Sequence, residues 1–196
     1  MRSASPATGV RDTGSGDIRV STSLPGDQAS VSVSLSVSPR EAFRVFTEEI
    51  DQWWRRGPQY RLAGRSPGAL TFEPRTGGRL FETYETASGP QLVQFGLVKV
   101  WDPPARLLFE WRNANFAPGE RTEVEVLFEP SANGTRVTLY HRGWASLRAG
   151  HPARHGLEGA AVSRMIGLWW GDLLTSLREH VQGANESGTA KGARSD

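Results

Sequence analysis

The sequence predicts an α+β fold in which a curved antiparallel sheet of about seven or eight strands wraps around one long C-terminal helix, with a short helix pair after the first strand. Three observations predict this fold. Apolar residues alternate with serines over 31–37, which is typical of a half-buried strand. Short alternating segments separated by Gly, Pro and Asn then follow as far as 142. From about 157 to 181 the apolar positions recur at steps of three and four, as in an amphipathic helix.

The first strand leads directly into a helix with its own start signal. Ser38 is expected to cap this helix and Pro39 to occupy its first position, where proline loses no hydrogen bond. Glu41 stands three residues after the cap and completes a capping box. The helix is therefore expected over 39–49, followed by two adjacent tryptophans, Trp53 and Trp54.

Turn sequences separate the strands that come after this helix. The strands are expected at Leu70–Pro74, Arg79–Glu85, Gln91–Trp101, Arg106–Arg112, Arg121–Glu129 and Thr135–Arg142. Glycines in 76–78 and 133–134 allow tight hairpins, and two prolines at 103–104 end a strand because proline has no N–H to donate. Since each strand closely follows its neighbour, the pattern predicts an antiparallel meander. At about 1.5 Å per residue the last helix reaches about 37 Å, long enough to cross the whole sheet.

Composition limits the class of protein. The chain of 196 residues has no Cys, which excludes a disulfide scaffold, a thiolate metal site and a cysteine nucleophile. Its 23 basic and 21 acidic residues leave a small net charge, so nucleic acid is not an expected partner. No run approaches the roughly 20 apolar residues of a membrane helix, and no membrane insertion is expected. Without an apolar signal region at the N-terminus, a cytoplasmic location is expected.

Three regions differ in their content of large apolar side chains. Residues 1–28 and 183–196 are polar, and we expect a disordered N-terminal arm and a disordered C-terminal tail, because such segments cannot bury enough surface to fold. Residues 29–182 are expected to form one domain with a single core.

Strand alternation assigns the side chains that face the helix. Where Glu110, Glu123, Glu125 or Lys99 should face water, their neighbours face inward: Leu107, Phe109, Trp111, Val124, Val126, Phe128, Val98 and Val100. Alternation over 136–142 assigns Val137, Leu139 and His141 to the same face. Aromatic rings gathered on this face predict a cavity suited to a flat or oily ligand. The expected ligand-binding residues are Trp54, Phe81, Val98, Phe109, Trp111, Val126, Phe128, His141, Trp144, Met165 and Trp169.

The histidines offer a weaker indication of chemistry. His141 lies on the expected inner face and is a catalytic candidate only if the protein is an enzyme; a hydrogen-bonded core residue is the alternative. His151 and His155 stand four apart, a spacing that suits two metal ligands on a helix, but Pro152 and Gly156 interrupt any helix there. We therefore expect no metal site and no cofactor. The segment that contains them is expected to be a loop and helix entry.

Five segments together resemble a known family. They are SPREAFRVFTEEIDQWW (38–54), FEPRTGGRLFE (72–82), VWDPPARLLFEWR (100–112), TEVEVLFEPSANGTRVTLYHRGW (122–144) and GLWWGDLLTSLREHV (167–181). The pattern resembles the START-like superfamily, also called helix-grip or SRPBCC. Within it, the likeness is to the activator of heat-shock-protein ATPase homologue type of domain. The resemblance implies the fold but not a reaction, since the superfamily holds lipid carriers, cyclases, chaperone activators and other binding proteins.

Three functions are compatible with these residues. The first is binding of a small hydrophobic or aromatic molecule in the cavity between helix and sheet. The second is a cyclase- or hydratase-like enzyme that uses His141 or a glutamate in the same cavity; catalysis usually needs two or three polar groups in mutual reach, and the inner face offers few. The third is a chaperone-associated interaction domain. A homodimer or a chaperone contact is possible but has no support in the sequence.

Overall fold

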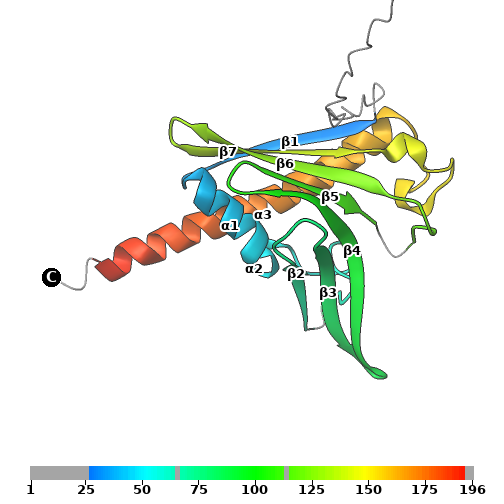
Figure 1. The fold of residues 1–196 in the computed structure, drawn as a ribbon, viewed down its shortest axis with the longest axis horizontal. Coiled ribbons are helices and arrows are strands. Elements are labelled where there is room, and N and C mark those ends of the chain that lie inside the picture. Colours follow the sequence, from blue (N-terminus) through cyan, green and yellow to red (C-terminus); the bar gives the residue numbers. More distant parts are fainter. Residues whose placement is uncertain (1–26, 65–66, 113–114, 193–196) are drawn as a thin grey trace, which may run out of the picture.

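Seven strands of the described chain form one curled antiparallel sheet that wraps around a long helix (Figure 1). The computed structural model describes residues 27–64, 67–112 and 115–192. The strands are β1 (Gln28–Leu35), β2 (Gly68–Phe72), β3 (Arg79–Thr86), β4 (Gly89–Asp102), β5 (Arg106–Trp111), β6 (Thr122–Ser131) and β7 (Gly134–Arg142). The helices are α1 (Pro39–Glu48), α2 (Ile50–Trp53) and α3 (Ala160–Gly192), with the 3-10 turns η1 (Trp144–Ser146) and η2 (Pro152–Arg154). The predicted fold class is confirmed.

The sheet order is β1-β7-β6-β5-β4-β3-β2, so β2 to β7 form the expected meander and β1 adds to its end. Val33 pairs with Val137 in the ladder between β1 and β7, and both are buried. Gly134 begins β7 with a φ of +134°, and a Cβ there would lie 2.2 Å from the carbonyl oxygen of Leu35. Only glycine therefore allows the chain ends of β1 and β7 to approach this closely.

The start of α1 follows the sequence prediction in part. The hydroxyl of Ser38 accepts a hydrogen bond from the backbone N–H of Glu41 at 3.3 Å, as a helix cap does. The Glu41 carboxylate instead binds Arg44, so the return half of the capping box is not formed. The inner side of α1 packs Phe43 and Phe46 against Phe128 of β6, with ring centroids 5.1 and 5.6 Å apart.

Helix α3 lies across the concave face and packs along β1. Its buried stripe is Val162, Ile166, Trp170, Leu173, Leu177 and Val181. The helix continues to Gly192, so residues 183–192 are helical rather than the disordered tail that composition predicts. Figure 1 shows this end projecting beyond the sheet, where the side chains of 183–186 are exposed. The disordered arm predicted over 1–28 lies outside the described residues except for its last two, Asp27 and Gln28, and Gln28 begins β1.

A bulge in β4 reverses one predicted orientation. Val98 pairs with Phe109 and is buried as expected, but the register shifts between Val98 and Val100. Val100 therefore pairs with outward-facing Leu108, and Trp101 pairs with the buried Leu107. Strict alternation placed Val100 inward, and the extra residue in the strand is the reason that this prediction is wrong.

None of the described helices is long and apolar enough to cross a membrane.

Candidate functional site

Four tryptophans meet between the sheet and the first half of α3. Trp54 follows α2, Trp111 ends β5, and Trp169 and Trp170 are neighbours on α3. The Trp54 ring stacks on Trp111 with centroids 6.0 Å apart, and both contact the α3 pair edge to face at 5.5–6.2 Å. Offset and edge-to-face aromatic pairs are favourable, so the four rings hold one another in place and form one rigid aromatic surface, called here the aromatic floor.

His141 is held inside this cluster by hydrogen bonds on both ring nitrogens. The indole N–H of Trp170 donates to His141 Nδ1 at 3.0 Å, which requires Nδ1 to be the unprotonated nitrogen. Nε2 therefore carries the proton and donates to the Thr122 hydroxyl at 2.8 Å, and that hydroxyl donates to the Trp111 carbonyl at 3.3 Å. Burial lowers the pKa of His141 to about 3. The imidazole is thus neutral near pH 7 and fully engaged.

A cleft of about 710 Å³ opens beside this cluster. It lies between α3, the loop after α2 and the segment after β7 that carries η1 and η2. Its lining is mainly apolar and includes Pro58, Trp111, Phe116, Trp144, Ala153, Met165, Ile166, Leu168 and Trp169. Polar side chains at its edge are Gln59, Tyr60, Asn115, His155 and Asp172, and the nearly buried His141 forms part of its wall. The cleft therefore joins an aromatic floor to a sparse polar rim.

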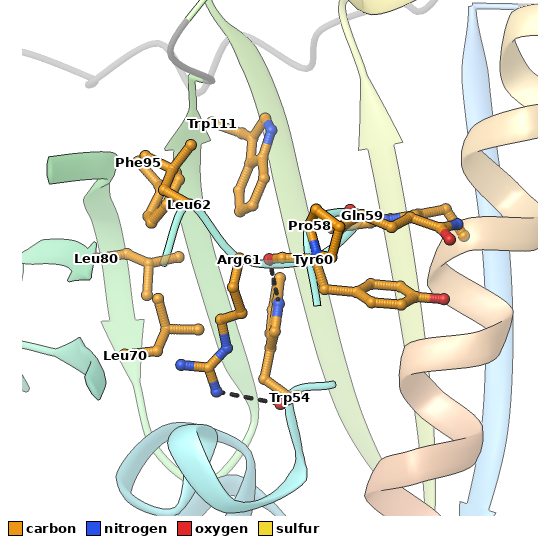
Figure 2. Close-up of a pocket in the computed structure, with 11 residues that line it drawn as sticks. Trp54, Pro58, Gln59, Tyr60, Arg61, Leu62, Leu70, Leu80, Phe95 and Trp111 are labelled. Atoms are coloured by element: carbon orange, nitrogen blue, oxygen red, sulfur yellow. Dashed lines mark hydrogen bonds between the residues drawn. The ribbon is translucent and has the colours of Figure 1, made fainter. Parts of the chain in front are cut away.

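A smaller pocket of about 130 Å³ adjoins the cleft, and Figure 2 shows the residues that line it. Leu70, Leu80 and Phe95 of the sheet form one wall, and the loop over 57–64 forms the other. The loop is held to the cluster, because the Trp54 indole N–H donates to the Tyr60 carbonyl at 3.1 Å. Pro58, Gln59, Tyr60, Trp111 and Trp169 line both spaces. We call the smaller space the inner pocket.

The charged groups of the rim are already paired. Asp172 on α3 binds Arg55 at 3.0 Å and also accepts the Tyr60 hydroxyl. Burial, together with the Asp172 carboxylate, raises the pKa of Tyr60 above its usual range, so the phenol stays protonated. Trp169 donates its indole N–H to the Gln59 carbonyl at 3.2 Å. These contacts fix the loop to α3 and leave little unbalanced charge at the mouth of the cleft.

The structure brings together part of the predicted site. Trp111, His141, Trp144, Met165 and Trp169 line the cleft, and Trp54 lines the inner pocket. The other expected residues do not reach either space. Val98, Phe109, Val126 and Phe128 are packed in the core, where Phe43 of α1 contacts Phe128 and Phe72 of β2 contacts Phe109.

Phe81 is the clearest error among the predicted residues. It lies on the outer face of β3, half-buried beneath Arg79, whose guanidinium is 5.0 Å from the ring centroid. Its neighbours Leu80 and Glu82 are fully buried on the inner face instead. Because successive side chains of a strand point to opposite faces, Phe81 faces outward when Leu80 and Glu82 face inward. The inward carboxylate of Glu82 accepts the backbone N–H of Leu62 at 2.8 Å.

Sequence reasoning also missed residues of the site. Trp170 is fully buried whereas Trp169 is half-buried, and steps of four from Val162 through Ile166 lead to Trp170. That spacing was available in the sequence. Tyr60 and Arg61, in contrast, come from a loop without periodicity, and no sequence pattern marked them.

The two histidines of the predicted loop do not form a metal site. His151 is buried, its Nε2 lies 3.0 Å from Glu120 and its Nδ1 accepts the Ala153 N–H at 3.1 Å. His155 is exposed in a left-handed conformation at the end of η2. Within the described parts of the chain no three metal-binding side chains gather.

A curled sheet that grips a long C-terminal helix and leaves a cleft beside it defines the START-like, helix-grip class of domain. Residues 36–181 match the model of the family described as Activator of Hsp90 ATPase homolog 1-like protein. Because the match spans most of the chain, the protein belongs to this family.

Solved structures support the fold. Protein NE0264 from Nitrosomonas europaea is similar at 17% identity, with 81% of this chain and 96% of that chain covered and a TM-score of 0.53. ChR145 from Cytophaga hutchinsonii is similar at 11% identity, with 81% and 96% covered and a TM-score of 0.57. Ms6760 from Mycobacterium smegmatis is similar at 12% identity, with 83% and 93% covered and a TM-score of 0.53. No curated protein matches the chain.

Proposed function

We propose that this protein binds a small, mainly apolar and uncharged aromatic molecule in the cleft beside α3. The observation that carries the proposal is the cleft of about 710 Å³ with aromatic walls, formed by Trp111, Phe116, Trp144 and Trp169. Small-molecule sites are typically clefts of about 300–1,000 Å³ with apolar linings and a few polar groups. Half-buried Met165 adds a side chain that adapts to irregular ligand shapes.

Charge favours a neutral ligand over an ionic one. Asp172 is the carboxylate of the described lining, and it is balanced by Arg55 and hydrogen-bonded by Tyr60. An anion would face this carboxylate, and a cation would have to compete with Arg55 for it.

The state of His141 bears on the enzyme alternative, which named this histidine or a glutamate of the cavity as its acid or base. Both nitrogens of His141 are occupied and its pKa is lowered to about 3, so the imidazole is a poor acid or base near neutral pH. The family description refers to an activator of Hsp90 ATPase. Contact with such a chaperone stays a prediction for this chain.

Titration with N-phenyl-1-naphthylamine, a neutral fluorescent probe, tests the proposal. The wild-type chain should bind the probe, and Met165→Arg should weaken binding at least about tenfold because it places a charge in the apolar lining. Ala161→Arg is the matched control, because Ala161 is exposed on the same helix and does not line the cleft. Equal probe binding by both variants would contradict the proposed site. Native mass spectrometry of protein purified from its own host would then identify a retained ligand.

A further inference from the structure

A second buried histidine, His151, lies where two segments of the cleft wall meet. It is 0% exposed and is not itself part of the cleft lining. One of the two segments is the loop before β6, which contributes Phe116 to the lining, and the other is η2, which contributes Ala153. Buried polar atoms are almost always hydrogen-bonded in folded proteins. The two ring nitrogens of His151 find one partner in each segment.

The loop before β6 is held through the Nε2 side of the ring. His151 Nε2 lies 3.0 Å from Glu120 Oε2, and the imidazole meets the Phe116 ring edge to face with centroids 4.8 Å apart. The same Glu120 oxygen accepts the backbone N–H of Ala117 at 2.8 Å. Ala117 is the chain neighbour of Phe116, so the carboxylate and the imidazole together fix this aromatic part of the cleft wall.

The turn η2 is held through the other ring nitrogen. The backbone N–H of Ala153 donates to His151 Nδ1 at 3.1 Å. Nδ1 must be unprotonated to accept this hydrogen bond, so the proton of the neutral ring is on Nε2, which donates it to Glu120. One protonation state, the neutral ring with its hydrogen on Nε2, therefore makes both contacts at once.

Charged groups reach this imidazole from two sides. Glu120 comes from the loop before β6, and Arg148, ahead of η2, faces the same carboxylate with its Nε 3.6 Å from Oε1. Arg154 of η2 donates instead to two backbone carbonyls at η1. The Ala117 N–H, together with His151 and Arg148, holds the pKa of the Glu120 carboxyl below its usual range. The carboxylate therefore stays ionised while a histidine titrates.

A second proton on the ring breaks one of the two contacts. A protonated Nδ1 carries a hydrogen that faces the Ala153 N–H, and two donors cannot form a hydrogen bond with each other. The bond from Nε2 to Glu120 survives, because it then joins opposite charges. Protonation thus keeps the loop of Phe116 in place and frees the turn that carries Ala153.

We propose that His151 is a positioning residue for the ligand, which holds both walls of the cleft when it is neutral and releases the η2 wall when it is protonated. The inference rests on the proposed function, since it assigns a control by pH to the same cleft. Histidine changes its charge between pH 5 and 8, so ligand that is bound at neutral pH should be released on mild acidification. The histidine of the cleft wall, His141, does not account for such a release, because its pKa of about 3 keeps it neutral in this range.

Titration of the full chain with N-phenyl-1-naphthylamine at pH 7.5 and pH 5.5 tests the inference. The wild-type chain should bind this probe about three- to tenfold more weakly at pH 5.5, since uptake of one proton changes affinity by at most about tenfold per pH unit. In His151→Asn a side-chain oxygen can accept the Ala153 N–H but cannot take up a proton, so the ratio of the two dissociation constants should fall below about twofold. His180→Gln is the control and should keep the wild-type ratio, because His180 lies on α3 against Glu49 and does not line the cleft.

The outcomes separate this inference from the proposed function. Equal affinity of the wild-type chain at the two pH values overturns the role of His151 while the proposed function stands, and this comparison needs no variant to fold. A wild-type ratio that persists in His151→Asn assigns the pH dependence to another group, such as His155 at the rim, and overturns the inference too. If the probe fails to bind the wild-type chain even at pH 7.5, the proposed function fails and the inference fails with it.

Discussion

The buried imidazole of His141 links the stability of the fold to pH, and acidification from pH 7 to pH 5 is the perturbation that exposes this link. Burial lowers the folded-state pKa to about 3 from an ordinary value of 6.5. Between these values the unfolded chain binds a proton that the folded chain does not. The contribution that the neutral His141 makes to the free energy of unfolding is therefore fully present above pH 6.5, and it is lost as the pH falls toward 3.

The size of the loss follows from the two pKa values. Each pH unit inside the window costs about 1.4 kcal/mol, and most of the interval from pH 7 to pH 5 lies within it, so His141 should account for about 2 kcal/mol. That is a large share of the roughly 5–15 kcal/mol that stabilises an ordinary domain. The paired carboxylates contribute at lower pH. Burial raises the pKa values of Glu49 and Asp51, but hydrogen bonds and ion pairs outweigh it and hold them below their ordinary 4.5 and 3.8. Their contribution to stability is therefore lost mainly below pH 5, outside the interval compared.

Urea titrations at pH 7 and pH 5 measure the effect. His141→Gln removes the titrating group, and the difference in unfolding free energy between the two pH values should shrink by about 2 kcal/mol relative to wild type. His155→Gln is the control, because His155 is exposed and the slope should not change. Nitrogen NMR of the wild-type imidazole provides a second measurement, in which Nδ1 should stay unprotonated at pH 5. An identical pH dependence in wild type and His141→Gln would refute the argument.

Three further predictions concern stability in urea. Trp170→Phe should lower the free energy of unfolding by about 1–3 kcal/mol, because the buried His141 loses the donor to its Nδ1. Trp169→Phe should lower it by less than about 1 kcal/mol. Similar losses in the two variants would contradict the role of Trp170 as the donor to His141. Arg61→Ala should lower the free energy of unfolding by about 2–4 kcal/mol, because it removes the buried partner of Asp51. Arg56→Ala removes an exposed partner of Asp51 and should lower it by less than about 1 kcal/mol. Deleting 183–196 should change stability by less than about 0.5 kcal/mol, and a marked drop would mean that this segment docks.

Local patterns were enough to predict most of the fold. Every residue that alternation assigned to the inner face of β5, β6 and β7 is buried, because each strand has one face against the core and one toward water. The cap at Ser38 was equally readable, since a helix start depends on a few adjacent residues. Where a single extra residue shifts the register, as between Val98 and Val100, the pattern fails without leaving a signal in the sequence.

The candidate site was predicted less completely because its contacts join distant segments. The partners of His141 are Thr122 and Trp170, nineteen and twenty-nine positions away, and nothing local showed that both ring nitrogens would be occupied. The burial of Glu82 depends on a backbone N–H at Leu62, twenty residues earlier. Burying this carboxylate requires a hydrogen-bond partner that the strand itself does not contain.

The position of the cleft follows from how the concave face is covered. Helix α1 packs Phe43 and Phe46 on Phe128, so that part of the face is filled and Val126 and Phe128 become core instead of cavity wall. Beside the first half of α3 the cover is made by two loops, which carry fewer large apolar side chains than a helix does. Space therefore remains there, and the sheet residues that reach it are Trp111 at the end of β5 and His141 of β7. A sheet curled around one helix and closed at one end by another leaves its opening at the opposite end, and that end is where the tryptophan cluster lies.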